Sequence, residues 1–242
     1  MIEGVELRFT PEREILVRSP GLFKEYHGNP DATAGARDAE GWFRTGDAGY
    51  LGEDGHLRII DRVDHVGALK DGSPFAPRLL ESKLKFVPYI KEAMVIGNGR
   101  SAASVLIDID PIAVGRWADK NFISYTGHAD LASRAETYGL IASCIAKVNA
   151  ALAHDPMLAR SQIGRFAILQ KELSADDGVL TRTGKLRRDV AADRYKPLID
   201  AIYAGDMQVR LGPAFGPAGV EFVDINIRNA NTAGSAPIGR AA

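Results

Sequence analysis

The feature that most constrains this chain is a stretch that an Asp-Gly pair divides into two apolar arms. Residues 48–51 read AGYL and precede the Asp54-Gly55 pair, and residues 57–60 read LRII and follow it. Such a pair favours a type I′ turn, because glycine readily adopts a positive φ. The sequence therefore predicts a β-hairpin centred on this pair.

The open end of the predicted hairpin carries polar groups. Asp47 enters the first strand, and Asp61-Arg62 leaves the second, so a carboxylate and a guanidinium should lie close together. A carboxylate accepts two hydrogen bonds, which suits the paired hydroxyls of a ribose, and a guanidinium adds charge-assisted donors. By residue type alone, a solvated ion pair worth about 0–1 kcal/mol is the simpler interpretation.

The composition is that of an ordinary soluble globular chain. With 242 residues, of which 45% are hydrophobic and 25% charged, the length permits one or two domains. A net charge of −1 gives no electrostatic footprint for nucleic acid. The single cysteine, Cys144, excludes an intramolecular disulfide and fits a reducing compartment. Because we find no apolar run of ~18–20 residues and no signal-peptide profile, we expect a cytoplasmic protein.

Periodicity predicts a mixed fold of strands and helices. Alternating or continuous apolar runs predict strands at 5–9, 14–18, 92–97, 103–109 and 166–170. Apolar stripes at helical spacing predict helices at 78–85, 113–121, 134–153 and 186–203. Between the hairpin and the first of these helices, residues 65–77 have the composition of a loop.

Neither the cysteine nor the histidines indicate a reactive or metal-binding site. Cys144 lies on the apolar stripe of the predicted 134–153 helix, and local spacing places no histidine beside it, which indicates a buried structural thiol. The five histidines show no metal-ligand spacing, so the sequence predicts no metal site within this chain.

A basic segment near the C-terminal end is the second chemical element. Residues 180–188 read LTRTGKLRR, which by composition is a cationic loop that opens a helix. A solvated positive surface explains such a loop without any catalytic role. Its Thr-x-x-Gly-Lys-x-x-Arg spacing over residues 181–188 nevertheless gives it a distinctive pattern.

These strings together resemble the signatures of the adenylate-forming superfamily, which includes the acyl-CoA synthetases, acyl ligases and luciferases. Residues 43–49 read FRTGDAG, residues 61–64 read DRVD, and the 181–188 string follows in the same order as in that family. Residues 20–30 (PGLFKEYHGNP) are similar to the segment that precedes the Thr-Gly-Asp motif in the family.

The resemblance implies roles for five residues. It implies that Asp47 binds the ribose hydroxyls of ATP and of the acyl-adenylate, and that Arg62 reaches the ribose or phosphate side. It implies a hinge at Asp64, about which the small domain turns between the two half-reactions. Lys185 falls on the lysine of the adenylate-forming step, and Gly72 lies in a loop expected to line the coenzyme A channel.

The resemblance also implies the architecture. We expect an α+β chain in which residues 1–63 end a distorted antiparallel β-barrel subdomain of the large AMP-binding domain. Residues 64–204 would form the mobile, small α/β C-terminal lid domain. Residues 205–242 depart from the family and are expected to be a variable, partly disordered tail with one strand at 220–227.

The family's large domain normally supplies several hundred upstream residues. These residues hold the triphosphate loop, the adenine pocket, the acyl tunnel and a glutamate that coordinates Mg²⁺. The chain therefore resembles the C-terminal fragment of a larger enzyme, and we expect it to be inactive without an N-terminal ATP-binding domain.

Two short segments direct the substrate expectation toward long fatty acids. Residues 88–93 (PYIKEA) and 172–178 (ELSADDG) resemble bacterial long-chain fatty-acyl synthetases. The resemblance implies a fatty acid–CoA ligase that uses ATP, Mg²⁺ and coenzyme A, with membrane contact only through its lipid substrate. Two alternatives stay open: a ligase for another carboxylic acid, and a catalytically inactive fragment that binds nucleotide or coenzyme A.

Overall fold

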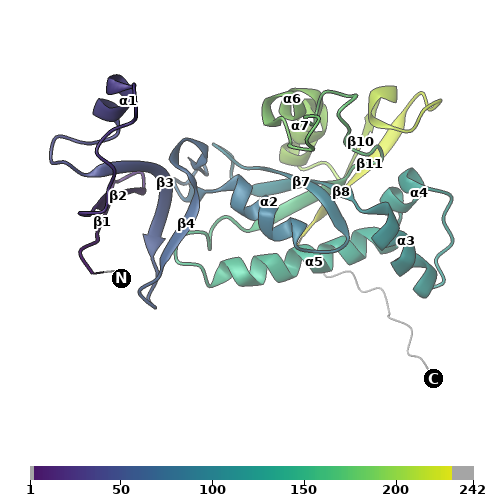
Figure 1. Cartoon of the computed structure of the whole chain (residues 1–242). Coiled ribbons are helices and arrows are strands. Elements are labelled where there is room, and N and C mark those ends of the chain that lie inside the picture. The colour runs from purple at the N-terminus through teal and green to yellow at the C-terminus, as the bar shows by residue number, and fades with distance from the viewer. Residues whose placement is uncertain (1–2, 231–242) are drawn as a thin grey trace. The chain divides into compact units, whose positions relative to one another are not determined.

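The computed structural model describes residues 3–230, which fall into two compact units, Met1–Gly67 and Ala68–Ala242 (Figure 1). Both units combine helices with sheets, so the expected α+β class is confirmed. In the part of the chain that the structure describes, no helix is long and apolar enough to cross a membrane.

The first unit is built on an open, antiparallel four-stranded sheet. Its strands pair in chain order: β1 (Glu6–Phe9), β2 (Glu14–Arg18), β3 (Phe43–Leu51) and β4 (Leu57–Arg62). The short helix α1 (Pro30–Gly35) lies in the connection from β2 to β3, and the Asn29 side chain caps it by accepting a hydrogen bond from Ala32 N. The 3₁₀ turn η1 (Val63–His65) follows β4.

The predicted hairpin is confirmed, but its turn is longer than predicted. Leu51 pairs with Leu57, and Gly52 N donates to His56 O at 2.9 Å, so the loop spans three residues instead of two. Gly55 has a φ of 74°, whereas Asp54 keeps a negative φ, and a type I′ turn needs positive φ at both positions. The loop is therefore of the type in which one glycine in the left-handed region follows a turn.

The second unit is built on a five-stranded mixed sheet in the order β10-β11-β9-β8-β7. Its strands are β7 (Ile90–Ile96), β8 (Ala103–Ile109), β9 (Ile163–Ile168), β10 (Gln208–Leu211) and β11 (Val223–Asn229). Only β8 and β9 are parallel, and the long crossover between them contains α3 (Pro111–Lys120), α4 (His128–Ser133) and α5 (Ala135–Ala153). Every residue of β8 is buried, because helices cover both faces of the sheet.

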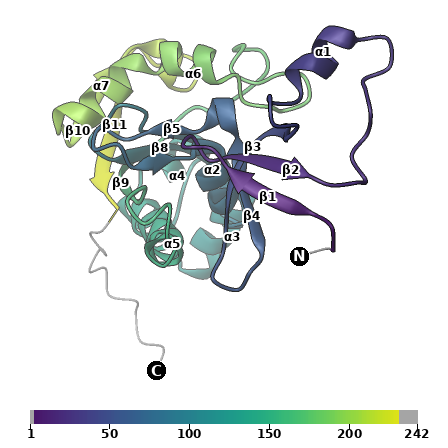
Figure 2. The same cartoon turned by 90° about the vertical axis from the view of Figure 1, so that its left-hand side faces the viewer.

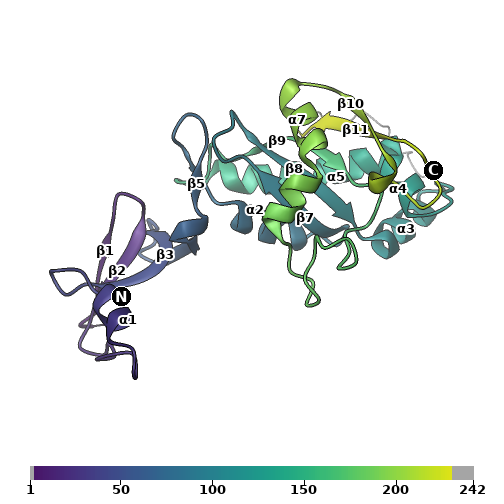
Figure 3. The same cartoon turned by 90° about the horizontal axis from the view of Figure 1, so that it is seen from above.

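Two layers of helices enclose this sheet. Helices α6 (Arg188–Arg194) and α7 (Lys196–Ala204) lie on one face, and α5 lies on the other with α2 (Pro77–Lys85), as Figures 1 and 2 show. Leu198 and Ile202 of α7 share a buried cluster with Leu106 of β8 and Ile225 of β11. Figure 3 shows α2, α5 and α7 from above.

Three expectations about local structure differ from what is observed. The helix expected at 186–203 is two helices, α6 and α7, which are interrupted at Tyr195. Pro197 has no N–H to donate to the carbonyl of Asp193 four residues earlier, so one continuous helix cannot form here. The loop expected at 65–77 contains a small hairpin of β5 (Gly67–Ala68) and β6 (Pro74–Phe75).

The third difference concerns residues 205–230, part of the segment expected to be a variable, partly disordered tail with one strand. Strands β10 and β11 extend the main sheet, and Ile225 and Ile227 have no exposed surface. The apolar side of β11 joins the core beneath α7, which explains why this strand packs with the domain. The disordered segment expected from residue 229 onward lies, for residues 231–242, outside the described residues.

Candidate functional site

Asp47 and Arg62 are direct cross-strand partners at the open end of the β3–β4 hairpin. Arg62 Nη1 donates to Asp47 Oδ1 at 3.0 Å and to the Thr45 carbonyl at 2.9 Å. The predicted proximity of carboxylate and guanidinium is thus confirmed. The Asp47 side chain is 35% exposed and that of Arg62 is 52% exposed, so both can reach a ligand.

Gly46 makes this pairing possible. Its φ is 69°, in the left-handed region, and a Cβ at this position would lie 2.3 Å from Arg62 Nη2. The guanidinium therefore occupies the space that any other side chain would need. This contact gives a physical reason for the glycine between Thr45 and Asp47.

A buried glutamate holds this strand segment to its neighbour. Glu14, on β2, is 4% exposed; its Oε1 accepts from Gly46 N at 3.1 Å, and its Oε2 accepts from Arg44 Nη2 at 2.6 Å. The Thr45 hydroxyl donates to Ile15 O at 2.8 Å. Sequence reasoning missed Glu14, because only the β2–β3 pairing reveals which acid lies opposite the motif.

Asp64 lies in η1, just before the boundary between the two units. It was expected outside regular structure, and it occupies a single 3₁₀ turn with a side chain that is 71% exposed. Nearby, His65 Nδ1 lies 3.4 Å from Asp61 Oδ1. A short, partly exposed turn at a unit boundary is a place where a few residues can absorb a change of φ and ψ.

Gly72 forms the turn between β5 and β6. Its φ is 82°, its N donates to Leu69 O at 2.9 Å, and a Cβ built on it would meet nothing within 4 Å. The turn is exposed, so its backbone is open to close approach by a ligand.

The Thr-x-x-Gly-Lys segment closes into a tight loop that presents Lys185. Thr181 N donates to Lys185 O at 2.8 Å, and Lys185 N donates to Thr181 Oγ1 at 3.0 Å. Gly184 supplies the positive φ of 76° that the turn requires. The hydroxyl and the glycine of the string therefore shape the loop, and the lysine side chain remains exposed.

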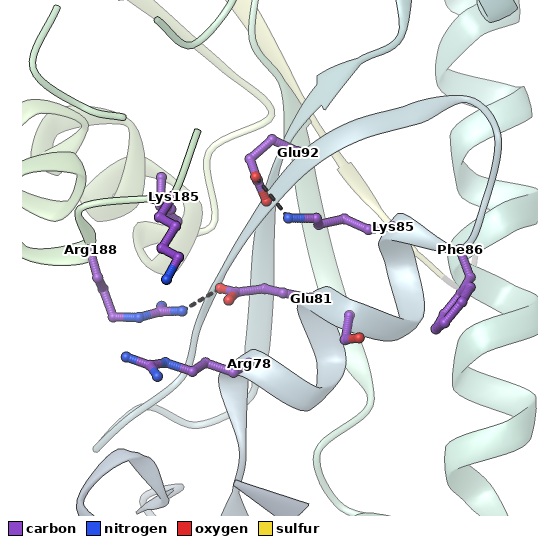
Figure 4. Close-up of a pocket in the computed structure, with 9 residues that line it drawn as sticks. Arg78, Glu81, Lys85, Phe86, Glu92, Lys185 and Arg188 are labelled. Carbon is purple, nitrogen blue, oxygen red and sulfur yellow. Dashed lines mark hydrogen bonds and ion pairs between the residues drawn. The ribbon is translucent and has the colours of Figure 1, made fainter. Parts of the chain in front are cut away.

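Lys185 projects into an open cleft of about 520 Å³ between its own loop and α2 (Figure 4). The cleft is lined mainly by charged groups, namely Arg78, Glu81, Lys85, Glu92, Lys185 and Arg188, together with Ser82, Phe86 and Leu186. All of these residues belong to the second unit.

A partly buried ion pair fixes one wall of the cleft. Arg188 Nη2 donates to Glu81 Oε1 at 2.5 Å, and Arg188 Nη1 donates to Val95 O at 2.9 Å. Glu81 also accepts from Val95 N at 2.7 Å. Burial raises the pKa of the Glu81 carboxyl, although the positive charge of Arg188 opposes this. Sequence reasoning placed Glu81 on a helix but missed the pair.

The structure therefore brings Asp47 and Arg62 together in the first unit and places Gly72 and Lys185 in the second. The described residues contain no group of three or more His, Cys, Asp or Glu side chains that could hold a metal ion.

Comparison with known proteins relates the second unit to a described domain. The sequence model of the "AMP-binding enzyme C-terminal domain" matches residues 64–207. Long-chain-fatty-acid–CoA ligase FadD15 of Mycobacterium tuberculosis is 35% identical over 205 residues, which cover 84% of this chain and 33% of the relative. Long-chain-fatty-acid–CoA ligase 6 of Homo sapiens is 31% identical over 202 residues, which cover 81% of this chain and 28% of the relative. The chain thus spans about a third of the length of the curated relatives it matches.

Two solved structures of adenylation domains are also similar to this chain. The adenylation domain of a carboxylate reductase from Mycobacterium chelonae is similar with a TM-score of 0.54 and 25% identity, over 83% of this chain and 31% of that one. The corresponding domain from Segniliparus rugosus, in complex with AMP and a co-purified carboxylic acid, has a TM-score of 0.55. At 20% identity, over 83% of this chain and 31% of that one, the second likeness shows the fold alone.

Proposed function

Because this chain belongs to the AMP-binding enzymes through their C-terminal domain, we propose that it is the C-terminal part of an ATP-dependent long-chain fatty acid–CoA ligase. The observation that carries this proposal is Lys185, which an ordered Thr-x-x-Gly-Lys loop presents within the matched domain. The names of the relatives support a long-chain fatty acid as the substrate.

The proposed reaction has two half-reactions. In the first, the fatty acid carboxylate attacks the α-phosphate of ATP, and pyrophosphate leaves. In the second, the coenzyme A thiol attacks the acyl carbonyl of the adenylate, and AMP leaves. We assign Mg²⁺ to the first half-reaction, where it would offset phosphate charge, and we place its ligands in a domain outside this chain.

The residues of this chain would bind the nucleotide and coenzyme A, and they would neutralise phosphate charge. Asp47 fits a ribose because its carboxylate is partly exposed, and the Asp47 Oδ1–Arg62 pair leaves Oδ2 able to accept a hydroxyl. The ammonium of Lys185 would offset the charge that builds at the α-phosphate during adenylation. Gly72 would let the pantetheine arm approach the backbone, and Asp64 would serve as the hinge between the two half-reactions.

The remaining features of the proposal concern the whole protein. Because the chain spans about a third of its relatives, we propose that a separate N-terminal domain supplies the ATP phosphate-binding loop and that the 242 residues alone are inactive. We place the protein in the cytoplasm, with membrane contact only through its lipid substrate. The likeness to a carboxylate reductase adenylation domain favours, as a second candidate, activation of another carboxylic acid.

The two half-reactions, measured separately in a full-length enzyme that contains this chain, test the proposal. Lys185→Ala should slow ATP-dependent adenylate formation by about 10²–10³-fold, since one preorganised charge-stabilising group is lost. The same variant should form thioester from preformed acyl-adenylate at the normal rate. Arg182→Ala removes an exposed cation from the same loop and should change neither step. Equal losses in both half-reactions for Lys185→Ala would contradict the proposal.

A further inference from the structure

Phe122 occupies a position that neither local backbone preference nor burial explains. Helix α3 ends in a Schellman motif, in which Phe122 N donates to Asp119 O at 3.2 Å and Ile123 N donates to Ala118 O at 2.9 Å. Phe122 has a φ of 57°, and this position normally holds glycine, because a β-carbon is unfavourable in the left-handed region. The residue is 97% exposed, so packing within the chain does not compensate for the strain. A ring held in this way indicates a contact with another molecule.

Helix α3 exposes a stripe of mixed character ahead of this ring. Ile112, Arg116 and Asp119 are separated by four and three residues, so they lie along one face of α3, and all three are exposed. Ile112 is 66% exposed, which is unusual for a large apolar side chain. Figures 1 and 3 show α3 at the periphery of the second unit.

The two charges of this stripe have no partner within the chain. Although Arg116 and Asp119 are about one helical turn apart, neither side chain makes a hydrogen bond or an ion pair with any of residues 3–230. Asp119 and Phe122 also line an open hollow of about 810 Å³, together with Ile123 and Tyr125. This face therefore carries a free cation, a free anion, an exposed ring and a hollow beside the ring.

These groups are complementary to a second copy of themselves. When two α3 helices pack antiparallel about a two-fold axis, each contact between them occurs twice. Such packing lets Arg116 of each copy meet Asp119 of the other. Ile112 then lies opposite Phe122 of the other copy, because the two lie four residues before the cation and three residues after the anion, respectively. Both pairings are centred beside Trp117, so one axis pairs both charges and covers both apolar side chains.

We propose that this chain associates as a two-fold dimer through α3. Arg116 of each copy pairs with Asp119 of the other, and Ile112 packs on Phe122 at the hollow. A contact limited to a ten-residue helix and the loop after it is smaller than the ~1,200–2,000 Å² of stable complexes, so the dimer is weak, with a Kd on the order of 100 µM. The contact involves α3 and its following loop alone, so this inference goes beyond the ligase proposal and does not rest on it.

The test is sedimentation equilibrium of the 242-residue chain at low salt, over a concentration range that spans this Kd. Arg116→Asp places acids opposite each other across the axis, and Asp119→Arg places cations there, so each reversal should weaken the dimer by at least about tenfold. The double variant Arg116→Asp/Asp119→Arg exchanges the charges and should recover the affinity of the unmodified chain. Recovery is expected only when the partner is another copy, because an unrelated partner would keep its own charges.

A glycine variant separates association from folding. Phe122→Gly suits the positive φ, so this variant should unfold at a urea concentration at least as high as the unmodified chain, whereas its dimer should be at least about tenfold weaker. Phe86→Ala and Lys147→Asp are matched controls, because they alter an exposed ring that follows α2 and an exposed cation on α5, outside this face. Both controls should dimerise like the unmodified chain.

Three outcomes would overturn the inference: a monomer at every concentration, no recovery in the double variant, or an equal loss in the controls. Co-sedimentation with vesicles of phosphatidylcholine and phosphatidylglycerol tests the other occupant of such a face. Vesicle binding by a monomeric chain, abolished in Phe122→Gly, would assign the face to a lipid surface instead of a second copy. The ligase proposal is judged by half-reaction rates, so either one can fail while the other stands.

Discussion

The guanidinium of Arg188 donates a hydrogen bond of 2.5 Å to the carboxylate of Glu81, although 107 residues separate the two in the sequence. The same guanidinium donates to Val95 O, so one side chain connects the start of α6 with both α2 and β7. Lys185 lies three residues before Arg188 in the string, and this pair therefore anchors the end of the Lys185 loop.

We expect Arg188→Ala to lower the free energy of unfolding by about 1–3 kcal/mol, because Glu81 would stay buried without its charged partner. Urea denaturation of the 242-residue chain measures this loss. Arg182→Ala, which removes an exposed arginine from the same segment, should change stability by less than about 0.5 kcal/mol. Similar losses in the two variants would show that the pair does not hold this region.

Gly46→Ala should lower the free energy of unfolding by more than backbone strain alone would. A left-handed φ costs a non-glycine residue about 1–2 kcal/mol, and at Gly46 the new Cβ would also displace the Arg62 guanidinium from Asp47. Gly55→Ala is the matched control, because its φ is 74° and nothing lies within 4 Å of the added Cβ. Unfolding free energies of both variants, with and without Arg62→Ala, measure the difference.

In the Arg62→Ala background the clash is absent, so the cost of Gly46→Ala should fall to that of Gly55→Ala. An unchanged cost of Gly46→Ala in that background would mean that Arg62 does not occupy the space beside this glycine.

Asp108 should make stability fall as pH rises. It has no exposed surface, and only its Oδ2 is satisfied, by Leu173 N at 3.0 Å. Burial raises the pKa of Asp108 from 3.8 to about 7, so between these values the folded state binds more protons than the unfolded state. The contribution of this group is therefore favourable at low pH and is lost, by at most about 1.4 kcal/mol per pH unit, as pH rises to about 7.

Asp108→Asn removes this titration and keeps an oxygen to accept from Leu173 N. Relative to the unmodified chain, the variant should gain unfolding free energy as pH rises from about 4 to 7 and keep a constant difference above that range. Urea denaturation across the range measures the difference. Asp189→Asn, at an exposed carboxylate, should show no such trend. A pH-independent difference for Asp108→Asn would contradict the expected titration.

Cys144 should be unreactive in the folded chain. It is 5% exposed on α5, and burial raises the pKa of its thiol, so little thiolate is present at neutral pH. As it is the only cysteine, a thiol-specific colour reagent reports on it alone. We expect slow reaction under native conditions and rapid reaction in denaturant; equally rapid reaction in both would contradict the buried position.

Much of the local structure could be predicted from sequence. The pairing of Asp47 with Arg62 follows from the hairpin, because strand alternation and an Asp-Gly turn lie within one short segment. The α5 helix and the burial of Cys144 follow from one continuous apolar stripe. The binding and catalytic roles of Asp47, Arg62, Asp64, Gly72 and Lys185 stay predictions, because they depend on ligands and on a domain outside this chain.

The amino-acid sequence alone determined the elements whose signal is local. These are the β3–β4 hairpin, α5 and the loop that presents Lys185. Only the tertiary structure decided that β11 enters the main sheet, that Glu14 holds the Thr45–Asp47 segment, and that Glu81 meets Arg188. The physical reason is that periodicity reports which face of an element is buried, whereas the partner on the other side is chosen by packing between segments far apart in the chain.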